Sequence, residues 1–99
     1  MDLQEILDNV LKGSKYLGTF PLADILVTSA SRHLSALAVA KEGKRQYYLA
    51  FLNGEPEGAV YVDPEGALFG DSAVSHIREA NQYVLCDVKP EIIDALVMG

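Results

Sequence analysis

Residues 34–62, LSALAVAKEGKRQYYLAFLNGEPEGAVYV, contain three apolar segments separated by two turns. The first turn is Glu42-Gly43-Lys44 and the second is Asn53-Gly54. Asn-Gly between extended apolar segments is the strongest short-range signal of a β-hairpin, because both residues tolerate the left-handed backbone of a type I′ turn. The stretch therefore predicts an antiparallel β-meander of three strands.

The two-residue turn also predicts a register for the second hairpin. With Asn53-Gly54 at its tip, Leu52 faces Glu55 and Tyr48 faces Ala59. Pro56 has no backbone N–H, so the start of the third strand should lie at an edge of the sheet or at a position without a ladder hydrogen bond.

Composition indicates an ordinary globular domain. The chain has 99 residues, 49% hydrophobic and 22% charged, and we expect residues 1–99 to form one domain, alone or as a module of a longer protein. The net charge of −6 argues against a nucleic-acid partner. Cys86 is the only cysteine, and neither a signal-peptide pattern nor an apolar run of about 20 residues is present, which predicts a cytoplasmic protein without a membrane partner.

Amphipathic helices are expected on both sides of the meander, because apolar residues recur there at helical spacing. Asp2 is placed to cap the first helix and Gly13 to end it. The expected elements are a helix over residues 3–11, a helix over 19–31, strands over 34–41, 45–52 and 55–62, a helix over 71–80, a strand over 83–88 and a helix from Pro90. The fold class is therefore α+β, with about four strands in the order α-α-β-β-β-α-β-α.

The meander carries more apolar surface than one face of a sheet needs. The strand over residues 45–52 is apolar on both faces, which is typical of a central strand covered on both sides. The strand before it presents Ala36, Ala38 and Ala40 on one face, so that a helix or a second subunit can approach closely. We expect a regulatory or protein-interaction module, self-associating as a homodimer through the first helix or this alanine face.

No catalytic, metal-binding or cofactor-binding motif is present. The chain has no phosphate-binding loop, no clustered Cys and His for zinc and no Gly-x-Ser-x-Gly elbow. An enzyme would need a pocket that gathers His33 or His76 with an acid. We therefore expect a non-enzymatic protein without a cofactor. The alternative is a domain that binds a small molecule or a metal ion.

The best candidate for a binding patch is the link between the second helix and the first strand of the meander. Ser31, Arg32 and His33, with Ser29 before them, offer donors and a cation that could hold an anion or a partner's carboxylates. The other interpretation is a polar helix end with an exposed arginine.

Two further features allow two interpretations each. Tyr47 and Tyr61 either form a recognition surface or pack in the sheet with their hydroxyl groups at its margin. No Lys or Arg occurs between Arg45 and Arg78, a segment with five acidic residues: Glu55, Glu57, Asp63, Glu65 and Asp71. These acids are either solvated turns or a site for a cation or a basic partner.

Residues 20–26, FPLADIL, and residues 31–39, SRHLSALAV, resemble the bacterial domain of unknown function found at the start of PatA-type response regulators and other signalling proteins. Residues 48–54, YLAFLNG, resemble its next strand, and the likeness extends to Val88. Leu34-Ser35 stand where that domain usually has a glycine. The resemblance implies a non-catalytic regulatory or interaction module and no catalytic residues.

Overall fold

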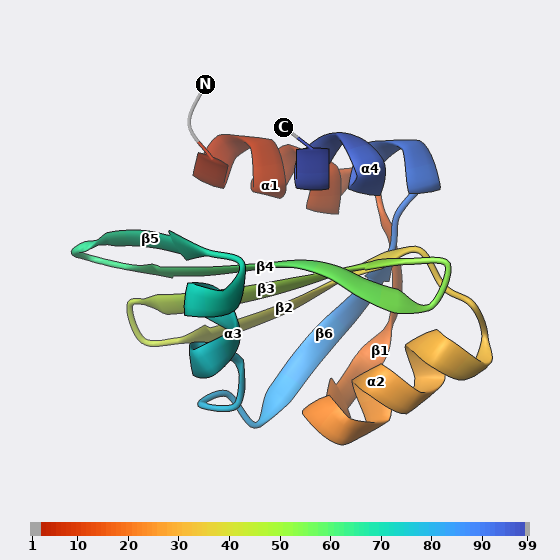
Figure 1. Ribbon diagram of the computed structural model, residues 1–99, viewed down its shortest axis with the longest axis horizontal. Helices are drawn as coiled ribbons and strands as arrows, with labels where there is room; N and C mark the ends of the chain where they lie inside the picture. The colour runs from red at the N-terminus through yellow and green to blue at the C-terminus, as the bar shows by residue number, and fades with distance from the viewer. Residues whose placement is uncertain (1–2, 99) are drawn as a thin grey trace.

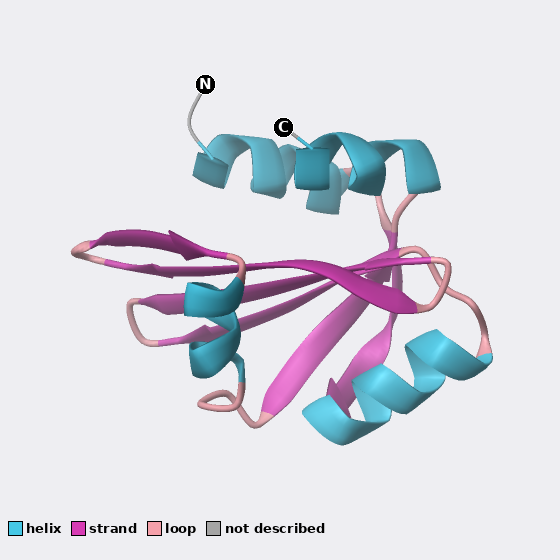
Figure 2. Cartoon of the chain, viewed as in Figure 1, coloured by secondary structure: helices cyan, strands magenta, loops and turns pink. Residues whose placement is uncertain are grey.

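The computed structural model describes residues 3–98, which form a six-stranded antiparallel sheet with helices on both faces (Figures 1 and 2). The strand order is β1-β6-β2-β3-β4-β5. The elements, in chain order, are α1 (Leu3–Lys12), β1 (Lys15–Pro21), α2 (Leu22–Ser31), β2 (Ala36–Glu42), β3 (Arg45–Leu52), β4 (Glu55–Asp63), β5 (Gly66–Phe69), α3 (Asp71–Ile77), β6 (Gln82–Asp87) and α4 (Pro90–Met98). The α+β class and the three-strand meander, β2 to β4, are confirmed.

One face of the sheet is covered by α1 and α4 (Figure 1). Leu7 of α1 and Ile93 of α4 are buried with Leu37, Val39 and Tyr48 of the sheet. The apolar stripe of α1 is therefore used inside the chain. No helix within residues 3–98 has the length and the apolar character needed to cross a membrane.

The other face is covered by α2 and α3, and it includes the alanine face of β2. Ala36 and Ala38 are fully buried, beside Ile25 of α2 and Tyr83 of β6. Both surfaces that the sequence suggested for a second copy are thus occupied within one chain. The homodimer stays a prediction.

The expected four strands and their order are corrected in two places. Residues 15–21 form strand β1 rather than a link and the start of a helix, and residues 66–69 form strand β5 rather than the end of a turn. β1 has Gly18 in its centre and Pro21 at its end, and β5 has only four residues, so neither shows a clear alternation of apolar residues. The expected cap at Asp2 lies outside the described residues.

The predicted register of the second hairpin is correct at its tip and wrong beyond Phe51. Leu52 pairs with Glu55, but Tyr48 pairs with Val60 instead of Ala59, because the register shifts between Ala50 and Phe51. The bulge lies where Pro56 faces Phe51, since proline cannot donate to the ladder. The outer neighbour β5 pairs only with residues 60–63, so Pro56 lies where β4 has no described strand on its outer side.

The Asn53-Gly54 turn packs directly against the end of α2. The Gly54 N–H donates to the Leu34 carbonyl at 2.7 Å, and the Asn53 N–H donates to Ser35 Oγ at 3.2 Å. A Cβ on Gly54 would lie 2.9 Å from the Ser29 carbonyl oxygen, and φ at this residue is +90°. Only glycine fits this close approach of two backbones.

We therefore expect Gly54→Ala to lower the free energy of unfolding by about 2–4 kcal/mol, combining the cost of a left-handed backbone with that of a backbone clash. Gly43→Ala is the matched control, because Gly43 also has a positive φ (+61°) but its Cβ would meet nothing within 4 Å. It should cost about 1 kcal/mol. Urea unfolding of the two variants measures the difference, and equal losses would show that the turn does not pack as described.

Candidate functional site

The link after α2 is held by a Schellman-type helix end. The Leu34 N–H donates to the Ser29 carbonyl at 3.0 Å, and the His33 N–H donates to the Ala30 carbonyl at 3.3 Å. His33 has φ +51° at the position where glycine is usual. A left-handed backbone at a non-glycine residue is a local strain that the surrounding contacts must hold.

The residues of the candidate patch differ in exposure at this helix end. Ser31, Arg32 and His33 are all exposed, as a binding patch requires. Ser29 is fully buried, and its Oγ has no hydrogen-bond partner among the described residues. Ser29 therefore cannot contact a ligand at the surface.

His33 lines a cavity of about 650 Å³ at the end of the sheet, which we call the loop-end cavity. Chain segments from α1, the α1–β1 link, the α2–β2 link, the Asn53 turn and the β6–α4 link meet there. Its charged and amide residues are Asn9, Lys15, His33, Asn53, Asp87 and Lys89, and apolar residues form the rest of the wall together with Ser14 and Ser35. This is the only part of the candidate patch that lies in a described cavity, and neither Ser31 nor Arg32 lines it.

Tyr47 and Tyr61 lie in the sheet face under α3, with 0% and 4% of their surface exposed. Their ring centroids are 5.4 Å apart, and Tyr61 stacks on His76 at 4.0 Å with an interplanar angle of 8°. The rings are thus packing residues, and the Tyr47 hydroxyl donates to Glu79 Oε1 at 3.2 Å. This agrees with the packing interpretation of the two tyrosines.

The same cluster contains an imidazole beside a carboxylate. His76 Nδ1 lies 2.9 Å from Glu79 Oε2, and Arg45 Nη1 lies 4.0 Å from Glu79 Oε1. The side chains of His76 and Glu79 are 31% and 39% exposed, and neither lines the loop-end cavity or the apolar cavity described next. The cluster ties the end of α3 to β3 and offers no enclosed place for a substrate.

The edge strand β5 forms a second candidate site at the far end of the sheet. All four of its residues are exposed, with Phe69 at 58% and Leu68 at 40%. Phe69 also lines an apolar cavity of about 220 Å³ bounded by α1, α4 and β4. We call β5 with this cavity the β5 site. Residues 66–69 are too short to show the alternation of a strand, so the sequence alone does not predict this site.

A metal site has no support in the described part of the chain, where no group of three His, Cys, Asp or Glu side chains is placed to hold an ion.

The sequence matches no protein-family model, and comparison with curated proteins and with solved structures found no similar chain. The resemblance to the PatA-type domain stays a prediction.

Burial raises the pKa of the phenols at Tyr47 and Tyr83, and the pKa of Tyr83 is raised well above its ordinary value. The Tyr83 hydroxyl donates to the Ile77 carbonyl at 2.6 Å, deep under α3. Because the folded-state pKa exceeds the unfolded value of about 10, the stabilisation is fully present below pH 10 and is lost as the pH rises above it.

We therefore expect the free energy of unfolding to fall as the pH rises above about 10, and Tyr83→Phe to make that fall shallower. Tyr16→Phe is the control, because Tyr16 is 62% exposed. Urea unfolding at several pH values measures both slopes. A slope that Tyr83→Phe leaves unchanged would contradict the assignment.

Proposed function

We propose that this protein is a non-catalytic interaction module that binds an extended, basic peptide segment of a partner protein along β5. The observation that carries the proposal is an edge strand whose four residues are all exposed and whose Phe69 lines an apolar cavity. An extended peptide adds to such an edge through main-chain hydrogen bonds, and pockets beside the edge select its side chains.

The two edges of the sheet differ in how they are protected. β1 carries Lys15 at its start, Pro21 at its end and a register shift between Tyr16 and Gly18. Lysine, proline and bulges are the usual means by which proteins block an edge against further strands. β5, with the sequence Gly-Ala-Leu-Phe, has none of them. An unprotected edge that is also apolar favours a pairing partner.

The side chains of β5 offer contacts on both faces of the sheet. Leu68 pairs with Tyr61, whose ring packs under α3, and Phe69 pairs with Val60, whose side chain packs on the α1/α4 face. Exposed Val74 of α3 and Val97 of α4 extend these two faces, at 53% and 42% exposure. Alternate side chains of an added strand would therefore meet apolar surface on each side.

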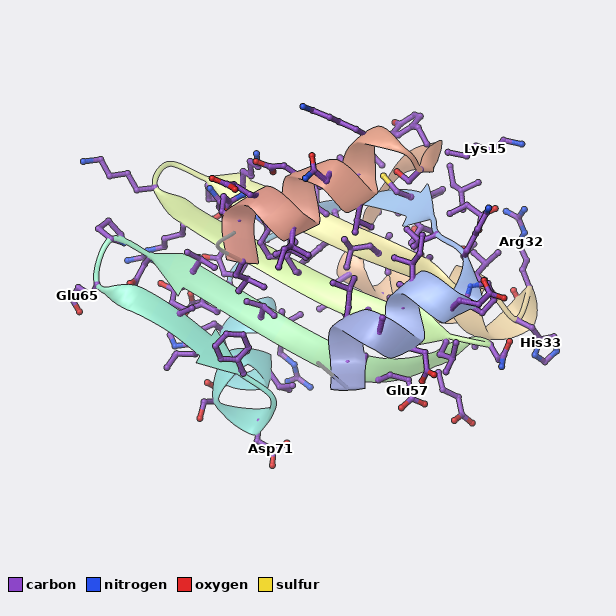
Figure 3. All side chains as sticks on the ribbon, turned by 90° about the horizontal axis from the view of Figure 1, so that it is seen from above. Lys15, Arg32, His33, Glu57, Glu65 and Asp71 are labelled. Carbon is purple, nitrogen blue, oxygen red and sulfur yellow. The ribbon has the colours of Figure 1, made fainter. Side chains whose placement is uncertain are left out.

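The acidic residues near β5 favour a basic peptide over a second copy of this chain. Figure 3 shows Glu65 and Asp71 pointing outward near the two ends of β5, and Glu57 outward from β4. Antiparallel pairing of β5 with a second copy would bring Glu65 of one chain toward Asp71 of the other, and like charges across a strand pair are destabilising. Lysine or arginine beside a short apolar run would instead complement this rim.

We expect a labelled peptide of alternating valine and threonine, flanked by lysine pairs, to bind with a micromolar Kd, because a four-residue edge buries little area. Fluorescence anisotropy measures the affinity, which should weaken as salt is raised. Phe69→Asp should weaken binding at least about tenfold. Val27→Asp is the matched control, because Val27 is exposed at 66% on α2, away from β5.

Two outcomes would contradict the proposal. One is equal binding of a peptide whose flanking lysines are replaced by glutamates. The other is a dimer in sedimentation across the micromolar range that Phe69→Asp converts to a monomer, because a second copy would then occupy the edge.

A further inference from the structure

The loop-end cavity concentrates positive charge in an acidic chain. The chain carries eight Lys and Arg against fourteen Asp and Glu, yet Lys15 and Lys89 both line this one cavity, beside the imidazole of His33. Figure 3 shows Lys15, Arg32 and His33 at one end of the sheet, with Glu65 at the other. Arg32 does not line the cavity, but it stands beside the cavity wall formed by His33.

The two lysines and His33 have no acidic partner within the described residues. Neither lysine, nor His33, has a carboxylate oxygen of residues 3–98 within the 4.0 Å that defines an ion pair. Asp87 lines the same cavity and lies opposite Lys15 in the backbone register of β1 and β6, but its carboxylate forms no ion pair with Lys15. Two lysines at one cavity, neither of them paired with a carboxylate, favour an anionic ligand.

The cavity is also held in a strained backbone arrangement. His33 and Asn53 are the only two non-glycine residues with positive φ in the described chain, at +51° and +52°, and both line the cavity. The hydrogen bond from the Asn53 N–H to Ser35 Oγ joins their two segments, so the turn and the helix end are fixed relative to each other. The cavity is therefore largely pre-formed, which lowers the cost of binding.

The remaining wall restricts the kind of anion. Val10, Leu34 and Ile92 are apolar, and a volume of about 650 Å³ is far larger than a single phosphate ion needs. Asp87 can accept a hydrogen bond from a hydroxyl group, but would repel a second anionic group near it. A ligand with one anionic end, hydroxyl groups and an apolar or ring portion fits all three features.

We infer that the loop-end cavity binds a small organic phosphate of the nucleoside monophosphate class. Its phosphate contacts Lys15, Lys89 and His33, its hydroxyl groups face Asp87, and its ring lies against the apolar wall. This site is separate from the β5 site, so either can fail without the other.

Isothermal titration calorimetry with AMP tests the inference, with adenosine and inorganic phosphate as partial ligands. We expect AMP to bind, and adenosine and phosphate to bind at least about tenfold more weakly, because each lacks one set of contacts. Lys15→Glu and Lys89→Glu should each weaken AMP binding about tenfold or more. Lys44→Glu is the control, since it makes the same charge change in the exposed β2–β3 turn.

The inference is overturned if AMP does not bind at millimolar concentration, or if Lys44→Glu weakens binding as much as Lys15→Glu. It is also overturned if adenosine binds as tightly as AMP, because the cations would then play no part. Phe69→Asp should leave AMP binding unchanged, so a failure of AMP binding can be told apart from a failure of peptide binding at the β5 site.

A second variant distinguishes ligand binding from a structural role of His33. His33→Gly removes the side chain and relieves the left-handed backbone, so the melting temperature should rise while the AMP affinity falls about tenfold. A purely structural His33 would give a change in melting temperature with no change in affinity, and that result would remove His33 from the site.

Discussion

The apolar character of both faces of β3 is the constraint on which the rest of the structure depends. Tyr47, Leu49 and Phe51 pack on one side of this strand and Tyr48 and Ala50 on the other, and all five are buried. A strand of this kind is stable only between two layers, so helices must cover both faces. α1 and α4 supply one layer and α2 and α3 the other. The apolar stripe of α1 and the alanine face of β2, which the sequence suggested for a second subunit, pack within this chain.

This arrangement also explains why apolar surface is exposed at β5. The helices lie over the central strands, and the short β5 projects beyond them at one edge (Figure 2). Its partner strand β4 contributes only residues 60–63 to the pairing. The outer side of β5 therefore keeps unpaired backbone groups and the side chains of Leu68 and Phe69. Interaction surfaces commonly occur where the scaffold is rigid but the edge is not covered.

The sequence predicted the features that depend on local residues. Asn53-Gly54 gave the hairpin and its tip, and the helical spacing of apolar residues gave the four helices. The strand order could not be predicted, because β6 pairs with β1 and β2, which are distant from it in the sequence, and no local pattern encodes such a pairing. β1 and β5 were missed because glycine, proline and short length hide their alternation. The sequence placed His33 in the link between a helix and a strand, but Lys15 and Lys89 come near it only because four separate loops meet in the fold. An isolated lysine in a sequence does not indicate which distant residues it will lie beside.

The separation of charge along the molecule bears on whether the two sites can act independently. Glu65 and the cavity residues Lys15 and His33 lie toward opposite ends of the molecule, whose longest dimension is 35 Å (Figure 3). At physiological ionic strength the Debye length is about 8 Å, so Glu65 is largely screened from an anion at the cavity. Asp87, within the cavity, is the carboxylate that would repel a bound phosphate.

At an ionic strength of 0.01 M the Debye length grows to about 30 Å, which is comparable to the size of the molecule. Electrostatic coupling between Glu65 and the cavity should therefore appear only at low salt, whereas coupling that persists at physiological salt would pass through packed elements, of which α1 and α4 line both the loop-end cavity and the cavity beside β5.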